Sequence, residues 1–253
     1  MVDRLVHSEV NSRRVVNVEQ CFGKGSMTLN TYGRVLVGEG ILVKMCRKKP
    51  KQRQFFLFND ILVYGNIVIS KKRYNKQRVI PLDSVTLEDL LDEGTLKNGW
   101  VIKTPSKSFA VYAATATEKK EWMLHIKRCV DVIKSKEDSK EVQLAPVWVP
   151  DNVATKCMCC KRKEFNLVSR RHHCRACGDV VCGGCSTHSL KIDTVNKNNP
   201  VRVCDKCFDS KTRPKNTNSD GKTAKENKEE GSDSSDDEVE LDKPISKPTF
   251  YNG

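Results

Sequence analysis

The sequence carries a short run of side chains that bind metals and anions, RRHHCRACG at residues 170–178. Its two cysteines are separated by two residues, a spacing that lets one tight turn bring two thiolates to the same metal ion. Three arginines and two histidines lie directly against that pair. This many cations in so short a stretch exceed what packing requires, and arginine forks grip oxyanions well, so we expect an anion to bind here.

Four cysteine pairs with this spacing occur between residues 157 and 207. Eight thiolates complete two tetrahedral sites, which are structural because no coordination position is left for water or substrate. Twelve cysteines in a chain whose start lacks a secretory signal favour metal over disulfides. Cys159 adjoins Cys160, but only Cys160 keeps the spacing. The predicted ligands are Cys157, Cys160, Cys174, Cys177, Cys182, Cys185, Cys204 and Cys207.

The residues between the pairs resemble the FYVE zinc finger. Residues 148–151 match the WxxD motif of that family, residues 170–175 its RRHHCR motif, and residues 202–204 its RVC motif, in the family's order. The resemblance implies two Zn²⁺ in cross-brace pairing. The first site would use Cys157, Cys160, Cys182 and Cys185, and the second Cys174, Cys177, Cys204 and Cys207.

The resemblance also implies that the basic pocket binds the head group of phosphatidylinositol 3-phosphate. By the family pattern, Arg175, Arg202 and one histidine face the 3-phosphate, while the first two arginines of the motif hold the phosphodiester. Asp151 and a histidine receive inositol hydroxyls. The alternative is that these cations only offset the negative charge of the zinc–thiolate centres. The implied contacts are Asp151, Arg170, Arg171, His172, His173, Arg175 and Arg202.

A short apolar stretch precedes the basic motif. Leu167 and Val168 suit a loop that inserts shallowly between lipids, as the membrane-touching turret of FYVE fingers does. Phe165 is expected to pack inward, because the small module has few other apolar residues. The alternative places Leu167 or Val168 inward too.

The N-terminal half is rich in short strands from residue 35 to about residue 115, with a hairpin turn expected at residues 59–60. Apolar residues then recur at helical spacing, and Thr115 with Glu118 predicts a capping box. Strands followed by one helix that contains Trp122 resemble a pleckstrin homology (PH) domain over residues 35–136. The expected fold class is therefore mainly β with little α: a barrel-like β-sandwich capped by a C-terminal helix, plus a small two-zinc finger.

The basic loop after the first strand is similar to the phosphoinositide pattern of PH domains. Lys44 would end the first strand, and Lys51 and Arg53 would open the second. Together they would focus positive potential on a phosphorylated inositol. A solvated basic loop is the alternative.

The order of the two modules resembles the phafin family of endosomal adaptors. It divides the chain into an N-terminal segment (1–34), a PH domain (35–136), a linker (137–147), a FYVE finger (148–209) and an acidic tail expected to be disordered (210–253). Residues 229–242 hold eight acids and no base, yet the chain has a net charge of +13. The rest is strongly basic, which suits an anionic membrane, nucleic acid or the chain's own acidic tail as a partner.

The resemblance to the phafin family implies a non-catalytic adaptor, cytoplasmic and peripheral on early endosomes, that binds phosphatidylinositol 3-phosphate and unidentified trafficking proteins. It would act in endosomal trafficking or autophagy. A RING-like ubiquitin ligase is the alternative, but the histidine ligand of its central C-x-H-x-x-C run is missing. Nucleic-acid binding is disfavoured because few aromatic residues interleave with the basic runs.

Overall fold

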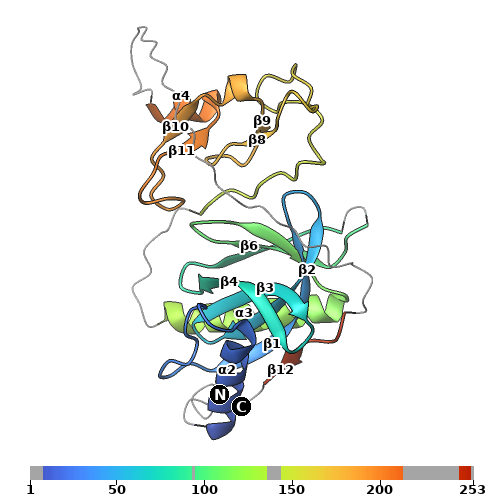
Figure 1. The fold of residues 1–253 in the computed structure, drawn as a ribbon, viewed down its shortest axis with the longest axis vertical. Coiled ribbons are helices and arrows are strands. Elements are labelled where there is room, and N and C mark those ends of the chain that lie inside the picture. The colour runs from blue at the N-terminus through green and yellow to red at the C-terminus, as the bar shows by residue number, and fades with distance from the viewer. Residues whose placement is uncertain (1–7, 93–94, 136–143, 213–244, 252–253) are drawn as a thin grey trace.

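A strongly bent antiparallel sheet forms the larger part of the molecule in the computed structural model, which describes residues 8–92, 95–135, 144–212 and 245–251 (Figure 1). The strand order is β4-β3-β2-β1-β7-β6-β5, and β12 pairs with β1 outside this path. The strands are β1 Leu36–Met45, β2 Pro50–Phe58, β3 Ile61–Ile69, β4 Arg73–Pro81, β5 Thr86–Asp89, β6 Gly99–Lys103 and β7 Phe109–Tyr112. We call residues 36–134 the sheet domain.

The inner face of the sheet encloses an apolar core that α3 (Ala116–Lys134) closes. The helix begins at Thr115, whose hydroxyl accepts the N–H of Glu118 at 3.2 Å. Glu118 in turn accepts the N–H of Ala114. Trp122 and Ile126 of α3 are fully buried. The predicted helix start, the hairpin turn at residues 59–60 and the fold class are therefore confirmed.

The outer face of the sheet carries a second helix that the sequence analysis did not assign. Val15, Val18 and Phe22 of α2 (Glu9–Phe22) pack on Phe56 and Phe58 of β2 and on neighbouring strands. Phe55 and Leu57 point to the inner core instead. Residues 55–58 are buried on both sides, which explains why β2 is apolar without alternation.

Residues 147–212, which we call the finger, lie beyond one end of the sheet domain (Figure 1). Short strands β8 (His172–His173) and β9 (Val180–Val181) form one ribbon, and β10 (His188–Leu190) and β11 (Val201–Val203) form another. A 3₁₀ turn, η1 (Gly183–Cys185), and a terminal helix, α4 (Asp205–Thr212), complete it.

The expected disorder of residues 210–253 is wrong at both ends of that range. Residues 210–212 continue α4, and residues 245–251 return to the sheet domain, where β12 (Thr249–Phe250) pairs with β1. The acidic stretch 229–242 lies outside the described residues. No helix in the described part of the chain is long and apolar enough to cross a membrane.

Candidate metal centres and lipid-binding site

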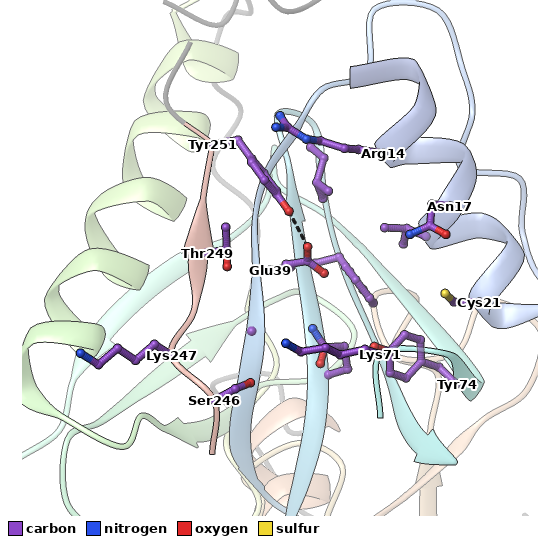
Figure 2. A pocket seen from close by; sticks show the side chains of 15 residues that line it. Arg14, Asn17, Cys21, Glu39, Lys71, Tyr74, Ser246, Lys247, Thr249 and Tyr251 are labelled. Atoms are coloured by element: carbon purple, nitrogen blue, oxygen red, sulfur yellow. Dashed lines mark hydrogen bonds between the residues drawn. The ribbon is translucent and has the colours of Figure 1, made fainter. Parts of the chain in front are cut away.

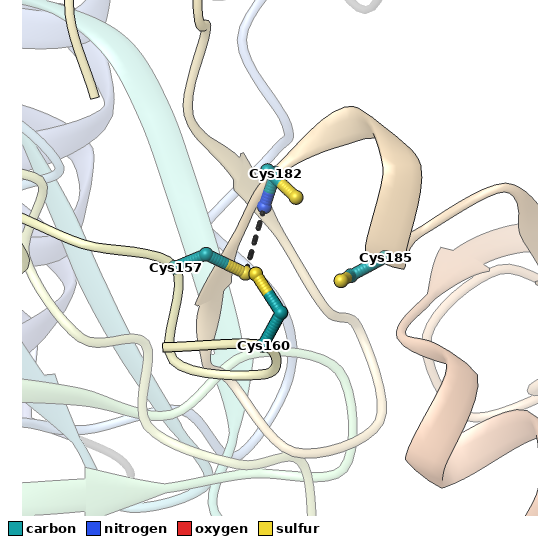
Figure 3. A group of neighbouring side chains, drawn as sticks. All are labelled: Cys157, Cys160, Cys182 and Cys185. Atoms are coloured by element: carbon teal, nitrogen blue, oxygen red, sulfur yellow. Dashed lines mark hydrogen bonds between the residues drawn. The ribbon is translucent and has the colours of Figure 1, made fainter. Parts of the chain in front are cut away.

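Eight cysteines gather into two tetrads. The sulfur atoms of each tetrad lie within 4.8 Å of one another, and no histidine belongs to either tetrad among the described residues. Four thiolates at this separation fit tetrahedral Zn²⁺. The first tetrad, drawn in Figure 3, is Cys157, Cys160, Cys182 and Cys185. The second is Cys174, Cys177, Cys204 and Cys207, so the cross-brace pairing is as predicted.

Backbone N–H groups point at some of the sulfur atoms. The N–H of Cys182 donates to Sγ of Cys157 at 3.3 Å, and the N–H of Cys204 donates to Sγ of Cys174 at 3.2 Å (Figure 3 shows the first). Backbone N–H groups of residues 162–163 lower the pKa of Cys160 to about 6. Cys159 instead lies beside Cys185 and Asp205. The donor set suits a soft, structural metal ion.

The small strands bring the basic motif together. His172 and His173 pair with residues 180–181, and Arg202 lies on β11. The N–H of Arg175 donates to the carbonyl of Arg202 at 2.9 Å, which joins the two motifs directly. The Arg202 guanidinium donates to the carbonyl of Ser186 at 3.1 Å. Residues from these two motifs thus share one surface.

Trp148 forms a wall of this surface. The His173 ring stacks on it with centroids 4.9 Å apart, and the Arg175 guanidinium lies 4.0 Å from its centroid. Nε2 of His173 lies 2.8 Å from the carbonyl oxygen of Val149, so this nitrogen carries the proton and donates. The WxxD motif therefore fixes the histidine and the arginine in place.

Positive charge on this surface, which we call the finger pocket after the ligand expected there, is crowded and partly buried. Burial lowers the pKa of His172 and of His173, and neighbouring arginines lower both further. Burial likewise lowers the pKa of Arg175. Oδ1 of Asp151 is buried without a hydrogen-bond partner in the described part of the chain. The pocket is therefore suited to a ligand that combines negative charge with hydroxyl donors.

The sheet domain contributes a residue that the sequence analysis did not assign to this pocket. Nε of Arg47, in the loop between β1 and β2, lies 3.0 Å from Oδ2 of Asp151. The N–H of Asp151 donates to the carbonyl of Arg47 at 3.1 Å. Nearby, Ser108 bridges to Val147 at the start of the finger. A separation of 104 residues gives such a contact no local sequence signal.

The first two arginines of the basic motif, Arg170 and Arg171, have different surroundings. Arg171 donates to the carbonyl of Ala154 at 3.3 Å, and its guanidinium lies 5.0 Å from the Phe165 ring centroid, whereas Arg170 is exposed.

The apolar loop before the basic motif points its tip at solvent. Leu167 and Val168 are 100% and 91% exposed, while Phe165 packs against the cysteine cluster. The inward alternative for Leu167 and Val168 is wrong.

The three basic residues of the sheet domain share one face of the β1–β2 hairpin. Lys44 pairs with Lys51, and Arg53 follows two residues along. This is the inner face, because Leu42 and Phe55 on it belong to the core. The Lys44 amino group lies 4.3 Å from the Phe109 ring centroid. The basic face therefore begins where the apolar core ends.

Comparison with known proteins identifies both modules. The family models of the PH domain and the FYVE zinc finger match residues 36–131 and 147–213. A Caenorhabditis elegans protein described as uncharacterized is 62% identical over 99% of this chain and 97% of its own length. Human pleckstrin homology domain-containing family F member 2 is 60% identical over 83% of this chain and 84% of its own. Human family F member 1 is 48% identical over 82% and 75%. The chain therefore belongs to the phafin family, in which a PH domain precedes a FYVE zinc finger.

Proposed function

We propose that this protein is a non-catalytic adaptor recruited to early endosomes by phosphatidylinositol 3-phosphate. PH and FYVE domains bind phosphoinositides in general. The observation that carries the proposal is Oδ1 of Asp151, which is buried beside crowded cations and has no hydrogen-bond partner in the described part of the chain. Nε2 of His173 lies 3.6 Å from it. A bare phosphate would be repelled by this carboxylate, whereas an inositol 3-phosphate supplies hydroxyls to it and a phosphate to the arginines.

The proposed contacts divide the pocket by charge. Arg175, Arg202 and a histidine take the 3-phosphate, and the arginines at 170–171 take the phosphodiester. Asp151 selects against a second ring phosphate nearby, because two anions in contact are unfavourable. Leu167 and Val168 enter the lipid layer beside the head group.

The sheet domain gives a second contact with the membrane through Lys44, Lys51 and Arg53. The Arg47–Asp151 pair keeps this basic face close to the finger pocket. The zinc centres hold the finger in shape and take no part in chemistry. The adaptor acts in endosomal trafficking or autophagy by bringing partner proteins to such membranes.

Vesicle sedimentation tests the proposal. Vesicles that contain either phosphatidylinositol 3-phosphate or unphosphorylated phosphatidylinositol are mixed with wild type, Arg202→Ala and Lys211→Ala. Arg202→Ala should weaken binding to the phosphorylated vesicles roughly 10- to 100-fold, as expected for lost charge-assisted hydrogen bonds of about 1.5–3 kcal/mol. Lys211→Ala removes the same charge from α4 and should bind normally. Equal binding of wild type to both vesicles would overturn the proposal.

A further inference from the structure

The first half of β1 has an edge that the seven-strand path does not use. β2 pairs with β1 along one side, but on the other side β7 pairs only with residues 43–44. An open strand edge binds another extended segment readily through its backbone groups. Here residues 249–250 pair with residues 38–39, and the N–H of Tyr251 donates to the carbonyl of Val37 at 2.8 Å.

Two glycines make room for this segment. A methyl group on Gly38 would lie 2.4 Å from Cδ1 and 2.8 Å from Cε1 of Phe250. One on Gly40 would lie 2.9 Å from Cβ of Pro248. Gly38 and Gly40 lie on the same face of β1, so the strand presents a trough without side chains along this stretch. The three atoms nearest to such a methyl group on Gly38 all belong to residues 249–250.

Helix α3 supplies an aromatic wall for the trough. The Phe250 ring stacks on His125 with centroids 4.2 Å apart and an interplanar angle of 11°. The same ring meets Trp122 edge-on at 5.2 Å. Such pairs contribute beyond the area that they bury. Phe250 therefore fills an apolar slot between β1 and α3.

The next residue is held by polar contacts on the other side. The Tyr251 hydroxyl donates to Oε1 of Glu39 at 2.5 Å, and the Arg14 guanidinium of α2 lies 3.9 Å from the Tyr251 ring centroid. Beside these residues, α2, β1, β2, β4 and the returning segment line an open pocket of about 280 Å³ (Figure 2). Adjacent residues of the segment thus engage different helices.

We propose that this trough, in the first half of β1 and away from Lys44 near the strand's other end, is a peptide-recognition site whose ligand is an extended segment of the pattern Pro-x-Phe-Tyr. Its occupant is the chain's own C-terminal segment, residues 245–251. Backbone pairing along β1 gives affinity, and the slots for Phe250 and Tyr251 give specificity. A connector of some tens of residues holds the segment at an effective concentration up to about a millimolar, so a modest intrinsic affinity keeps it docked.

The test uses full-length chains and a fluorescent peptide of residues 245–251, followed by anisotropy. Phe250→Asp removes the ring that packs on Trp122 and His125 and so vacates the site in the same chain. Gly38→Ala combined with Phe250→Asp vacates the site and then blocks it. A peptide that itself carries Phe250→Asp is the matched control ligand. Thermal melting of each variant confirms that the sheet domain remains folded.

We expect the peptide to bind the Phe250→Asp chain with a micromolar Kd and to bind wild type at least tenfold more weakly, because the wild-type site is occupied. The double variant and the control peptide should show no binding. Failure of the peptide to bind the folded Phe250→Asp chain would overturn the proposal, as would equal binding to the double variant. Amide hydrogen exchange gives a second check: the N–H of Tyr251 should be protected in wild type and lose protection in Gly38→Ala alone.

Discussion

The sheet domain and the finger are stabilised in different ways. The sheet domain buries large side chains in its core, among them Trp100, Trp122 and Phe55, each less than 2% exposed. In the described part of the finger, the buried members of the core cluster are Val181, Val203 and three cysteines, and larger side chains such as Phe165 and Phe208 are only partly buried against it. An apolar core stabilises a fold in proportion to the area that it removes from water. The finger buries too little apolar area for this, so its stability must come from metal–sulfur bonds.

The same difference decides how each region holds basic side chains. In the sheet domain, Lys44 packs over Phe109 at the edge of an apolar core. In the finger, His173 and Arg175 are held by Trp148 and by backbone carbonyls of segments that the tetrads tie together. We therefore expect metal loss to abolish the finger pocket and to leave the basic face of the sheet domain intact.

Chelation is expected to have the largest effect. A strong zinc chelator should unfold residues 148–209 and leave residues 36–134 folded, because only the finger lacks an apolar core. Hydrogen exchange followed by mass spectrometry reports on both regions in one full-length sample. Loss of protection in both regions at the same chelator concentration would contradict the modular account.

Substitution of one cysteine at a time should distinguish the zinc ligands from cysteines that bind no zinc. Cys160→Ser removes one sulfur from the first tetrad, whereas Cys159→Ser changes its neighbour outside both tetrads. We expect zinc content to fall from two ions to one per chain in Cys160→Ser and to stay at two in Cys159→Ser. Native mass spectrometry counts the ions, and equal zinc content in the two variants would show that the tetrad is assigned wrongly.

Local signals predicted much of this fold. The cap at Thr115, the burial of Trp122 and the hairpin turn each depend on residues close in sequence. The C-x-x-C spacing of the cysteine pairs likewise predicted the eight metal ligands. The docking of α2 was missed, although Val15, Val18 and Phe22 recur at helical spacing. No sequence pattern predicted where β12 lies, because a two-residue strand is too short to show one and its position depends on the trough of β1 into which it packs. The Arg47–Asp151 contact likewise depends on how two modules meet.

The exposed apolar side chains Leu167 and Val168 should contribute less to membrane binding than the arginines of the finger pocket. Changing Leu167 and Val168 to Ala removes about five methylene equivalents, each worth about 0.8 kcal/mol when fully buried. Since insertion is shallow, we expect roughly tenfold weaker binding to phosphatidylinositol 3-phosphate vesicles. Leu124→Ala on α3, which is 46% exposed, is the control and should bind like wild type. An unchanged affinity for the double variant would argue against insertion.

The smallest predicted effect concerns the contact between the two regions. Arg47→Ala removes a half-exposed ion pair of a kind worth at most about 1 kcal/mol, so vesicle affinity should fall by less than about fivefold. Lys48→Ala removes the same charge from the same loop and serves as the control for general electrostatics. The difference in vesicle affinity between the two variants, measured by surface plasmon resonance, gives the contribution of the Arg47–Asp151 ion pair. A larger loss in Lys48→Ala than in Arg47→Ala would reject a specific role for the contact.

We propose that the finger pocket, and not the basic face of the sheet domain, recognises the 3-phosphate. Isothermal titration with a water-soluble, short-chain phosphatidylinositol 3-phosphate measures this without a membrane. We predict that Arg175→Ala with Arg202→Ala abolishes the heat of binding in the full-length chain, whereas Lys51→Ala with Arg53→Ala changes the Kd less than threefold. Binding that survives the finger substitutions and disappears with the sheet-domain substitutions would show that the sheet domain recognises the 3-phosphate instead.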